Sequence, residues 1–438
     1  MVPSTSNIGL QGKMGQQIGD ELIAKILGLL SPADLARAEA SCTHWRGVSR
    51  EYGLWTAHLT RLTAAIAEHR QAAVNAASEQ PADARQASAH NTSRSASAAC
   101  AAGTAESSDG CPGGTESCKR RYTELQMAQR WRHGRTQSRY LAGHTGAVTA
   151  CSAWGGRWLA SGSADQTVRI WDLASGITCA TLRHGAPVSA LSMLGPSTVA
   201  AGSGPGMYLW RGGRCVRKYS VEGRRAAVRQ LAVLDSALAT ASGDSLVPVW
   251  DLYSGSLQRM LRPHEATAVN CLLATELGSQ QVLISGDSQG RVVLTDLEGS
   301  SPLAELSMHD FLGMASADLL AMTPDGRRLL AAGSRGEVMS WDLRMLGGRP
   351  GFAGQVLIRR PHRTLVSAMS VPEYGADVFA LAGPDGHLCL HDLHSGRLLR
   401  SIQRLGKSSV LSLAGVANGW VGGRADHGLV LWQFGGWQ

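Results

Sequence analysis

Short stretches in which apolar and polar residues alternate recur along the chain from Arg139 onward. In Val168-Arg169-Ile170-Trp171 the alternation has the two-residue period of a half-buried β-strand. Each unit contains a Gly/His-type corner, an apolar strand of the Leu-Ala-Ser-Gly type, an Asp-containing turn, and a strand that ends in Trp-Asp or a degenerate version of it. The pattern therefore predicts a repeated unit of four short strands.

The spacing of the strand endings identifies the repeat. Intervals of 39, 40, 45, 46, 50 and 41 residues separate seven endings, which lie at Trp171, Trp210, Trp250, Thr295, Trp341, His391 and Trp432. A mean of about 43 residues is the period of a WD-repeat propeller blade. Because one such sheet cannot bury both of its faces, residues 139–438 are predicted to form an all-β propeller of seven blades. Because the second and third repeats are degenerate, the number of blades is predicted only to within about one.

The first repeat carries a set of polar corner residues. His144, Ser161, Asp165 and Trp171 match the hydrogen-bonded tetrad of the WD-repeat family, so the resemblance implies a structural network of buried polar groups. A catalytic His/Ser/Asp set is the alternative, and the spacing favours the structural role. The last repeat ends after its third strand, and residues 138–142 are expected to supply the fourth and so remove a free sheet edge.

The N-terminal part of the chain has a helical periodicity. Leu22, Ile26 and Leu30 recur at the spacing i, i+4, i+8. Ser31-Pro32-Ala33-Asp34 has the features of a helix start: an N-cap, a proline in the first helical position and a capping-box acid. Residues 18–62 are therefore predicted to form a small all-α unit.

Composition divides the remaining residues. Residues 1–17 are polar and Gly-rich, and are expected to be a flexible tail. Residues 63–118 are rich in Ala, Ser, Gly and Gln, which predicts a largely disordered linker whose early part can extend a helix. Residues 119–138, with Leu125, Met127 and Trp131, are predicted to form a connecting helix that leads into the propeller.

Overall composition excludes several classes of protein. A hydrophobic content of 44% with 17% charged residues excludes a fully disordered chain. No uncharged apolar run approaches the ~20 residues of a membrane-spanning helix, and the first 17 residues lack a signal-peptide core. The nine cysteines include no Cys-x-x-Cys pair, which predicts a reducing compartment, cytoplasmic or nuclear, with no disulfide framework and no zinc site.

The net charge of +8 is mild and spread along the chain. The densest basic cluster is Lys119-Arg120-Arg121, so nucleic-acid binding is permitted by the charge and not required by it. We expect no nucleic-acid, small-molecule or membrane partner. No cofactor, metal site or catalytic residue is predicted, because the Gly-x-Ser-x-Gly match at Gly286–Gly290 lies between two blade strands and His264-Glu265 lacks a second histidine.

Together these features make the chain similar to members of the F-box/WD-repeat protein family. Residues 18–55 are similar to an F-box, with Gly19 where the family usually has proline, and Trp131-Arg132-His133-Gly134 is similar to the element that precedes the propeller in that family. The resemblance implies a multidomain chain, a small all-α F-box followed by an all-β seven-bladed WD-repeat propeller. It also implies that the F-box binds the Skp-type adaptor of a cullin-RING ubiquitin ligase while the propeller binds a protein substrate.

The resemblance also assigns residues to the two interactions. Adaptor binding is expected from the apolar residues of the F-box, some of which form its small core: Ile18, Leu22, Ile26, Leu27, Leu30, Pro32, Leu35, Trp45 and Trp55. The alternative is a helical unit that merely packs on its own chain. Substrate binding is expected from arginines in the corner loops and turns: Arg224, Arg225, Arg262, Arg335, Arg360, Arg363 and Arg424. Their planar guanidinium groups favour phosphorylated or acidic degrons, and ordinary solvated loop residues are the alternative.

The function predicted from the sequence is therefore that of a substrate-recognition adaptor of an SCF-type ubiquitin ligase, without an active site of its own. The leading alternative is a WD-repeat scaffold that assembles protein complexes without ubiquitin-ligase function. A propeller that associates with RNA or DNA is a third possibility, which rests only on the basic charge balance.

Overall fold

The structure is a computed structural model that divides into two compact units, Met1–Gln126 and Met127–Gln438. It describes residues 53–78, 129–221, 226–265, 267–298, 302–308, 316–323, 326–333, 336–345, 355–358, 366–372, 378–402 and 408–435. It also describes ten further residues: Leu27, Pro32, Leu35, Ala36, Glu39, Ser49, Tyr122, Thr123, Gln126 and Met127. The predicted tail at 1–17 lies outside this set.

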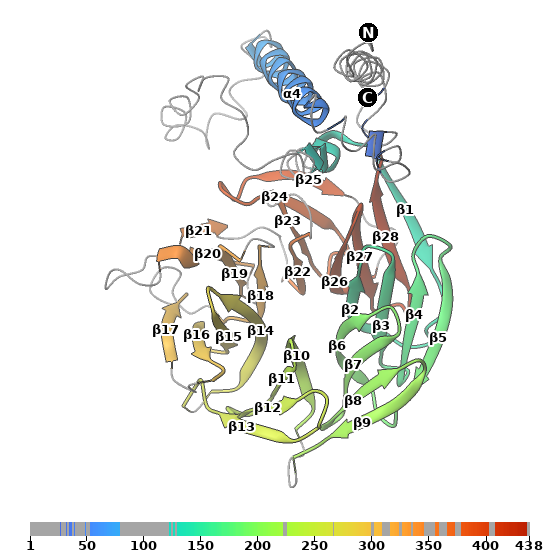
Figure 1. Ribbon diagram of the computed structural model, residues 1–438, viewed down its shortest axis with the longest axis vertical. Coiled ribbons are helices and arrows are strands. Elements are labelled where there is room, and N and C mark those ends of the chain that lie inside the picture. The colour runs from blue at the N-terminus through green and yellow to red at the C-terminus, as the bar shows by residue number, and fades with distance from the viewer. Residues whose placement is uncertain are drawn as a thin grey trace, which may run out of the picture. The chain divides into compact units, whose positions relative to one another are not determined.

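The described part of the first unit is helical. Its long helix is α4 (Leu54–Ser78), drawn in blue in Figure 1, and Leu27, Leu35 and Tyr122 also have helical backbone. α4 continues past residue 62, as expected for a linker whose early part can extend a helix. Ala-rich sequence explains this extension, because alanine has the highest helix propensity. Residues 79–118 of the predicted linker lie outside the described residues.

The second unit contains seven antiparallel sheets of four strands each, as predicted (Figure 1). The first three blades are β2–β5, β6–β9 and β10–β13. Their bounds are β2 (Val148–Trp154), β3 (Trp158–Ser163), β4 (Thr167–Asp172), β5 (Ile177–Arg183), β6 (Val188–Gly195), β7 (Thr198–Ser203), β8 (Gly206–Arg211), β9 (Arg214–Tyr219), β10 (Val228–Leu234), β11 (Ala237–Ser242), β12 (Val247–Asp251) and β13 (Leu257–Leu261).

The next three blades are β14–β17, β18–β21 and β22–β25. Their bounds are β14 (Val269–Leu277), β15 (Gln280–Asp287), β16 (Arg291–Asp296), β17 (Pro302–Ser307), β18 (Leu319–Met322), β19 (Arg328–Ala332), β20 (Val338–Asp342), β21 (Gln355–Ile358), β22 (Ala368–Ser370), β23 (Val378–Ala382), β24 (Leu388–Asp392) and β25 (Leu398–Ile402). A short 3-10 helix, η2 (Leu343–Met345), follows β20.

The seventh blade joins the two ends of the propeller. It combines β26 (Val410–Val416), β27 (Gly419–Arg424) and β28 (Leu429–Phe434) with β1 (Thr136–Leu141). β1 pairs antiparallel with β28 from Thr136 opposite Phe434 to Leu141 opposite Leu429. The predicted closure is therefore confirmed, and the free edge that a three-stranded last blade would leave is covered.

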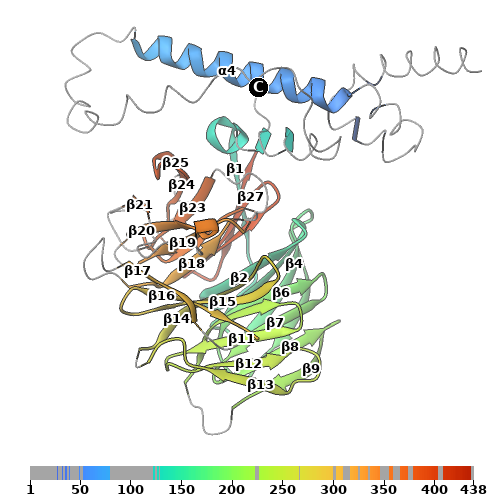
Figure 2. The same cartoon turned by 60° about the vertical axis from the view of Figure 1, so that its left-hand side comes forward.

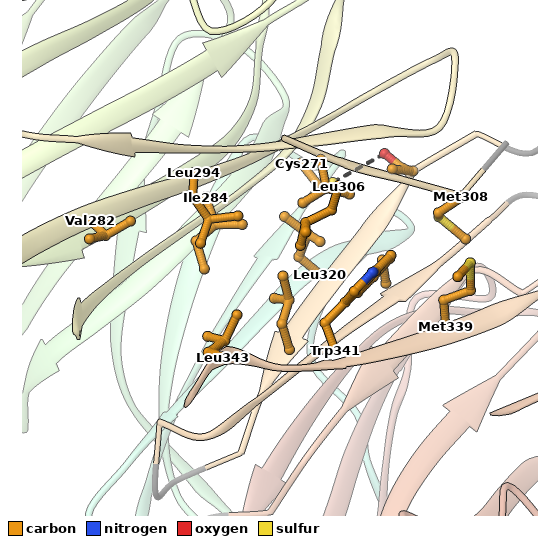
Figure 3. Close-up of a cluster of buried hydrophobic side chains, with 14 residues drawn as sticks. Cys271, Val282, Ile284, Leu294, Leu306, Met308, Leu320, Met339, Trp341 and Leu343 are labelled. Carbon is orange, nitrogen blue, oxygen red and sulfur yellow. Dashed lines mark hydrogen bonds between the residues drawn. The ribbon is translucent and has the colours of Figure 1, made fainter. Parts of the chain in front are cut away.

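The core of the propeller lies between neighbouring blades. The first strand of each blade contacts the first strand of the next, and β26 contacts β2, so the ring is closed. One cluster of buried apolar side chains fills each of the seven junctions. Figure 3 shows the junction of the fourth and fifth blades, where Ile284 and Leu294 lie near Leu320 and Trp341. Each blade therefore buries its faces against its two neighbours.

A helical turn leads into the propeller and packs on it. Trp131 is buried, and its ring lies 5.1 Å from that of Trp420 in β27. Arg132 reaches Asp392 at the end of β24, with Nη2 3.2 Å from Oδ2. A Cβ at Gly134 would lie 2.4 Å from the backbone oxygen of Arg130, so only glycine fits this position. The Trp-Arg-x-Gly element is thus part of the propeller's own packing.

Candidate functional site

The predicted tetrad of the first blade is formed. His144 Nδ1 lies 2.8 Å from Asp165 Oδ2, and His144 Nε2 lies 2.8 Å from Ser161 Oγ. Trp171 donates its indole N–H to the same Ser161 Oγ at 2.8 Å. The four side chains come from three segments of the blade, namely the corner before β2, strand β3 with the turn after it, and strand β4. Their hydrogen bonds therefore fix how these segments sit together.

The environment of the tetrad explains why it is structural. Ser161 is fully buried and already accepts the indole N–H, so its oxygen has no access to a substrate carbonyl. Burial lowers the pKa of His144, partly offset by its hydrogen bond to Asp165. Burial alone would raise the pKa of Asp165, but hydrogen bonds from Thr167, the Thr145 amide and His144 bring it well below its usual range. The result is a carboxylate that holds a neutral imidazole in a fixed tautomer.

The fourth blade contains a second polar corner that sequence analysis missed. His264 Nε2 lies 3.0 Å from Ser285 Oγ, and His264 Nδ1 lies 3.2 Å from Asp287 Oδ2. Asp287 is fully buried and also accepts a hydrogen bond from Thr267 Oγ1 at 2.6 Å. Thr295 stands in strand β16 where the first blade has its tryptophan. The corner therefore retains the histidine, serine and carboxylate without the indole.

A shift of the acidic residue hides this corner in the sequence. Asp165 lies in the turn after β3, whereas Asp287 is the last residue of β15, two positions earlier relative to the tetrad serine. Asp287 and Ser288 belong to the Gly-x-Ser-x-Gly match, which the structure places at the end of β15 and in the turn before β16. The combination of Ser285 with His264 twenty-one residues earlier is the signal that could have revealed the corner.

The second blade keeps the histidine and tryptophan but lacks their partners. Ala201 and Pro205 occupy the positions that Ser161 and Asp165 hold in the first blade. His184 now packs directly on Trp210, with ring centroids 5.2 Å apart, and on Tyr208 at the same separation. Both His184 nitrogens and the Trp210 indole nitrogen are buried without a hydrogen-bond partner among the described residues.

This arrangement predicts an acid-sensitive second blade. Burial lowers the pKa of His184 from 6.5 to about 4. Between these values the unfolded chain binds the proton more readily, so the contribution of neutral His184 to stability is complete above pH 6.5 and is lost as the pH falls toward 4. We expect His184→Phe to flatten the dependence of the free energy of unfolding on pH in this window, as measured by urea titrations followed by circular dichroism. The exposed His394→Phe is the control, and parallel profiles for wild type and His184→Phe would contradict the prediction.

The structure describes two of the seven predicted substrate-binding arginines. Arg262 is exposed immediately after β13. Arg424 is buried in β27, forms an ion pair with Asp426 (Nη2 to Oδ2, 2.6 Å) and lies over the Tyr140 ring at 5.7 Å, so its guanidinium is already engaged within the seventh blade. Five predicted residues lie outside the described part of the chain: Arg224, Arg225, Arg335, Arg360 and Arg363.

The predicted adaptor-binding residues that are described belong mainly to the core of the helical unit. Leu27, Leu35 and Trp55 are buried, and Pro32 is partly buried. Trp55 donates its indole N–H to Glu39 at 2.9 Å, and its ring lies 6.0 Å from that of Tyr122 in a T-shaped arrangement. The remaining predicted residues lie outside the described set: Ile18, Leu22, Ile26, Leu30 and Trp45.

Among the described residues, no group of three or more His, Cys, Asp or Glu side chains is arranged to hold a metal ion. Their five cysteines are free thiols, and burial raises the pKa of Cys151 to about 12. Over the same described residues, no helix combines the length and apolar character that crossing a membrane requires.

Comparison with known families and proteins agrees with this architecture. Residues 20–61 match the model of the F-box-like family, and residues 135–172 match that of the WD domain, G-beta repeat. Target of rapamycin complex subunit wat1 of Schizosaccharomyces pombe is 29% identical over 189 residues, 42% of this chain and 58% of that protein. Mitochondrial division protein 1 of Neurospora crassa is 36% identical over 124 residues, 28% of this chain and 17% of that protein. The match thus spans less than two thirds of either relative.

The segments that match the two family models can be located relative to the blades of the second unit. The WD-repeat match covers β1 to β4, the strands that close the ring and carry the tetrad. The structure extends the same four-stranded unit to seven blades, and the F-box-like match lies before them. Both are protein-interaction modules. The chain is therefore an F-box/WD-repeat protein.

Proposed function

We propose that the chain is a substrate-recognition adaptor of an SCF-type ubiquitin ligase in the cytoplasm or nucleus. One observation carries the proposal: an F-box-like segment and a seven-bladed propeller occur in one chain. The F-box binds the Skp-type adaptor, and the propeller binds the target protein. Such a receptor needs no catalytic group, because holding a target lysine near a charged ubiquitin carrier accelerates transfer by proximity.

The composition of the helical unit supports a partner at this segment. A segment as short as the F-box-like match, residues 20–61, has a marginal hydrophobic core by itself. The buried Leu27, Leu35 and Trp55 supply part of that core. Apolar residues at 18, 22, 26 and 30 have the sequence spacing of a helical stripe, whose burial by an adaptor would stabilise the unit further.

Affinity purification followed by mass spectrometry tests the proposal. Leu30→Glu places a charge in the proposed docking stripe, and Thr63→Glu, on the exposed side of α4, is the matched control. We expect Skp-type and cullin subunits to co-purify with the wild type and with Thr63→Glu, and to fall by about tenfold or more with Leu30→Glu. A Trp55 variant is unsuitable, because removing this buried ring would unfold the unit.

Failure of the wild type to retain ligase subunits would favour a WD-repeat scaffold instead. Proteins that co-purify equally with wild type and Leu30→Glu are the propeller's own partners. We further propose that these partners present phosphorylated or acidic degrons to the exposed Arg262 and to Arg224, Arg225, Arg335, Arg360 and Arg363. Phosphatase treatment of the lysate in the same experiment would then remove the phosphorylated partners.

A further inference from the structure

The second blade and the strand β5 that precedes it have an unusual charge composition. Residues 173–221 contain five basic residues and no aspartate or glutamate. All five are exposed: Arg183, Arg211, Arg214, Arg217 and Lys218. More than half of the net charge of +8 therefore corresponds to this one segment.

The charge concentrates on β9, the outer strand of the blade. Arg214, Arg217 and Lys218 lie in this six-residue strand, and Arg211 ends β8 just before it. Every β9 residue except Tyr219 is exposed. None of these four cations lies in an ion pair with a described residue, although Arg217 extends toward Asp251 of the third blade and contributes to lowering its pKa, after hydrogen bonds from Ser254.

No other outer strand resembles β9 in this respect. Each of the other six carries at most one basic residue: Arg139 in β1, Arg183 in β5, Arg259 in β13 and Arg400 in β25, with none in β17 or β21. Basic side chains protect sheet edges from aggregation in general. That role would apply to every blade alike, so it does not explain three cations on β9 alone.

β9 is held firmly at its C-terminal end. Tyr219 donates its hydroxyl to the Leu252 carbonyl of the third blade at 2.6 Å. Lys218 lies over the ring of Tyr208, its cross-strand partner in β8, with Nζ 5.7 Å from the centroid. A Cβ at Gly255 would lie 3.1 Å from Arg217 Cδ, so this side chain packs on the neighbouring turn. A strand fixed in this way loses little entropy when it binds an extended partner.

The outer edge of β9 is open to pairing. β9 is the last strand of its sheet and pairs with β8 alone, on the rim of the ring in Figure 1. Its other edge therefore presents backbone N–H and C=O groups. Val216, 49% exposed, lies between the cations and offers an apolar contact.

We propose that β9 is a docking edge for an extended, acidic segment of a partner protein. The segment adds a fifth strand to the second blade through backbone hydrogen bonds, and its carboxylates face Arg211, Arg214 and Lys218. This edge is distinct from the corner arginines of the proposed degron surface, and the inference does not depend on ubiquitin-ligase function.

A peptide-binding experiment with the full chain tests the proposal. The probe is a fluorescein-labelled Glu-Val-Glu-Val-Glu-Val peptide with capped ends, measured by fluorescence anisotropy at several salt concentrations. We expect saturable, salt-sensitive binding that Arg214→Glu/Lys218→Glu weakens by about tenfold or more. The control Arg135→Glu/Arg397→Glu makes the same charge change at exposed positions outside the second blade, and should alter the dissociation constant by less than about twofold.

Two further probes separate strand addition from other modes of binding. A version of the peptide with alternate backbone nitrogens methylated keeps the charges but cannot pair with β9, so we expect it to bind at least about tenfold more weakly. Equal binding of the methylated peptide, or equal loss in the control variant, would overturn the proposal, as would no binding at all. A single-stranded oligothymidylate that binds more tightly than the peptide and is lost in Arg214→Glu/Lys218→Glu would assign the edge to nucleic acid instead.

Discussion

Asp287→Ala is expected to lower the free energy of unfolding of the propeller by about 3–5 kcal/mol. The carboxylate is fully buried and accepts hydrogen bonds from the backbone amides of Gln289 (2.9 Å) and Arg291 (2.8 Å). Thr267 Oγ1 donates at 2.6 Å, and Arg291 Nε and His264 Nδ1 lie 3.1 Å and 3.2 Å from Oδ2. Alanine would leave these donors without an acceptor in a site that water does not reach.

Thermal unfolding followed by circular dichroism measures this effect. A loss of this size lowers the Tm of a propeller of this length by about 5–8 °C. Glu305→Ala is the matched control, because Glu305 is an exposed carboxylate on the outer strand of the same blade. Asp287→Asn keeps the shape but turns an amide N–H₂ toward donors, so we expect a Tm between those of the wild type and Asp287→Ala. Equal Tm values for the Asp287→Ala and Glu305→Ala variants would show that the buried corner does not hold the blade.

The architecture of the propeller was predictable because its signals are periodic. Seven strand endings at intervals of 39 to 50 residues predicted seven blades to within about one, even where Thr295 and His391 replace tryptophan, and the structure has seven. The interior of each junction needs only apolar residues of suitable size, so degenerate repeats still pack. Closure by β1 followed from a last repeat that lacks its fourth strand.

Polar corners were less predictable because they depend on single positions. The first blade has all four tetrad residues at the expected spacing and forms the expected hydrogen bonds. The fourth blade reaches a similar geometry with the carboxylate two positions earlier, at Asp287. The end of strand β15 and the turn after β3 both bring a carboxylate within reach of the corner histidine, so the network survives a change that breaks the sequence motif.

Local periodicity predicted the structure of the N-terminal unit only in part. The stripe of apolar residues predicted helices, but not that α4 extends to Ser78 or that Tyr122 packs against Trp55. Tyr122 is separated from Trp55 by the long Ala/Ser/Gly-rich segment, and no short-range pattern links the two rings. The segment predicted as one connecting helix at 119–138 in fact contributes Tyr122 to the first unit and Trp131 to the second.

Trp131→Ala is the second substitution with a large expected effect. Trp131 is 1% exposed, lies before the first strand and fills the junction of the sixth and seventh blades together with Trp420 and Val378. Its indole nitrogen has no hydrogen-bond partner among the described residues, so its contribution is that of a large apolar ring. Removing a buried tryptophan costs about 3–5 kcal/mol through lost burial and the cavity left behind.

The same unfolding assay shows whether the helical turn that contains Trp131 is part of the propeller core or only a connection to it. Trp154→Ala removes a tryptophan that is 41% exposed at the end of β2, and should change the free energy of unfolding by less than about 1 kcal/mol. Trp131→Phe retains part of the ring, so we expect an intermediate loss. If Trp131→Ala were as stable as Trp154→Ala, the helical turn before β1 would be dispensable for folding. If it is less stable by the expected amount, the propeller begins at this turn, and truncations that start at β1 will lack part of their core.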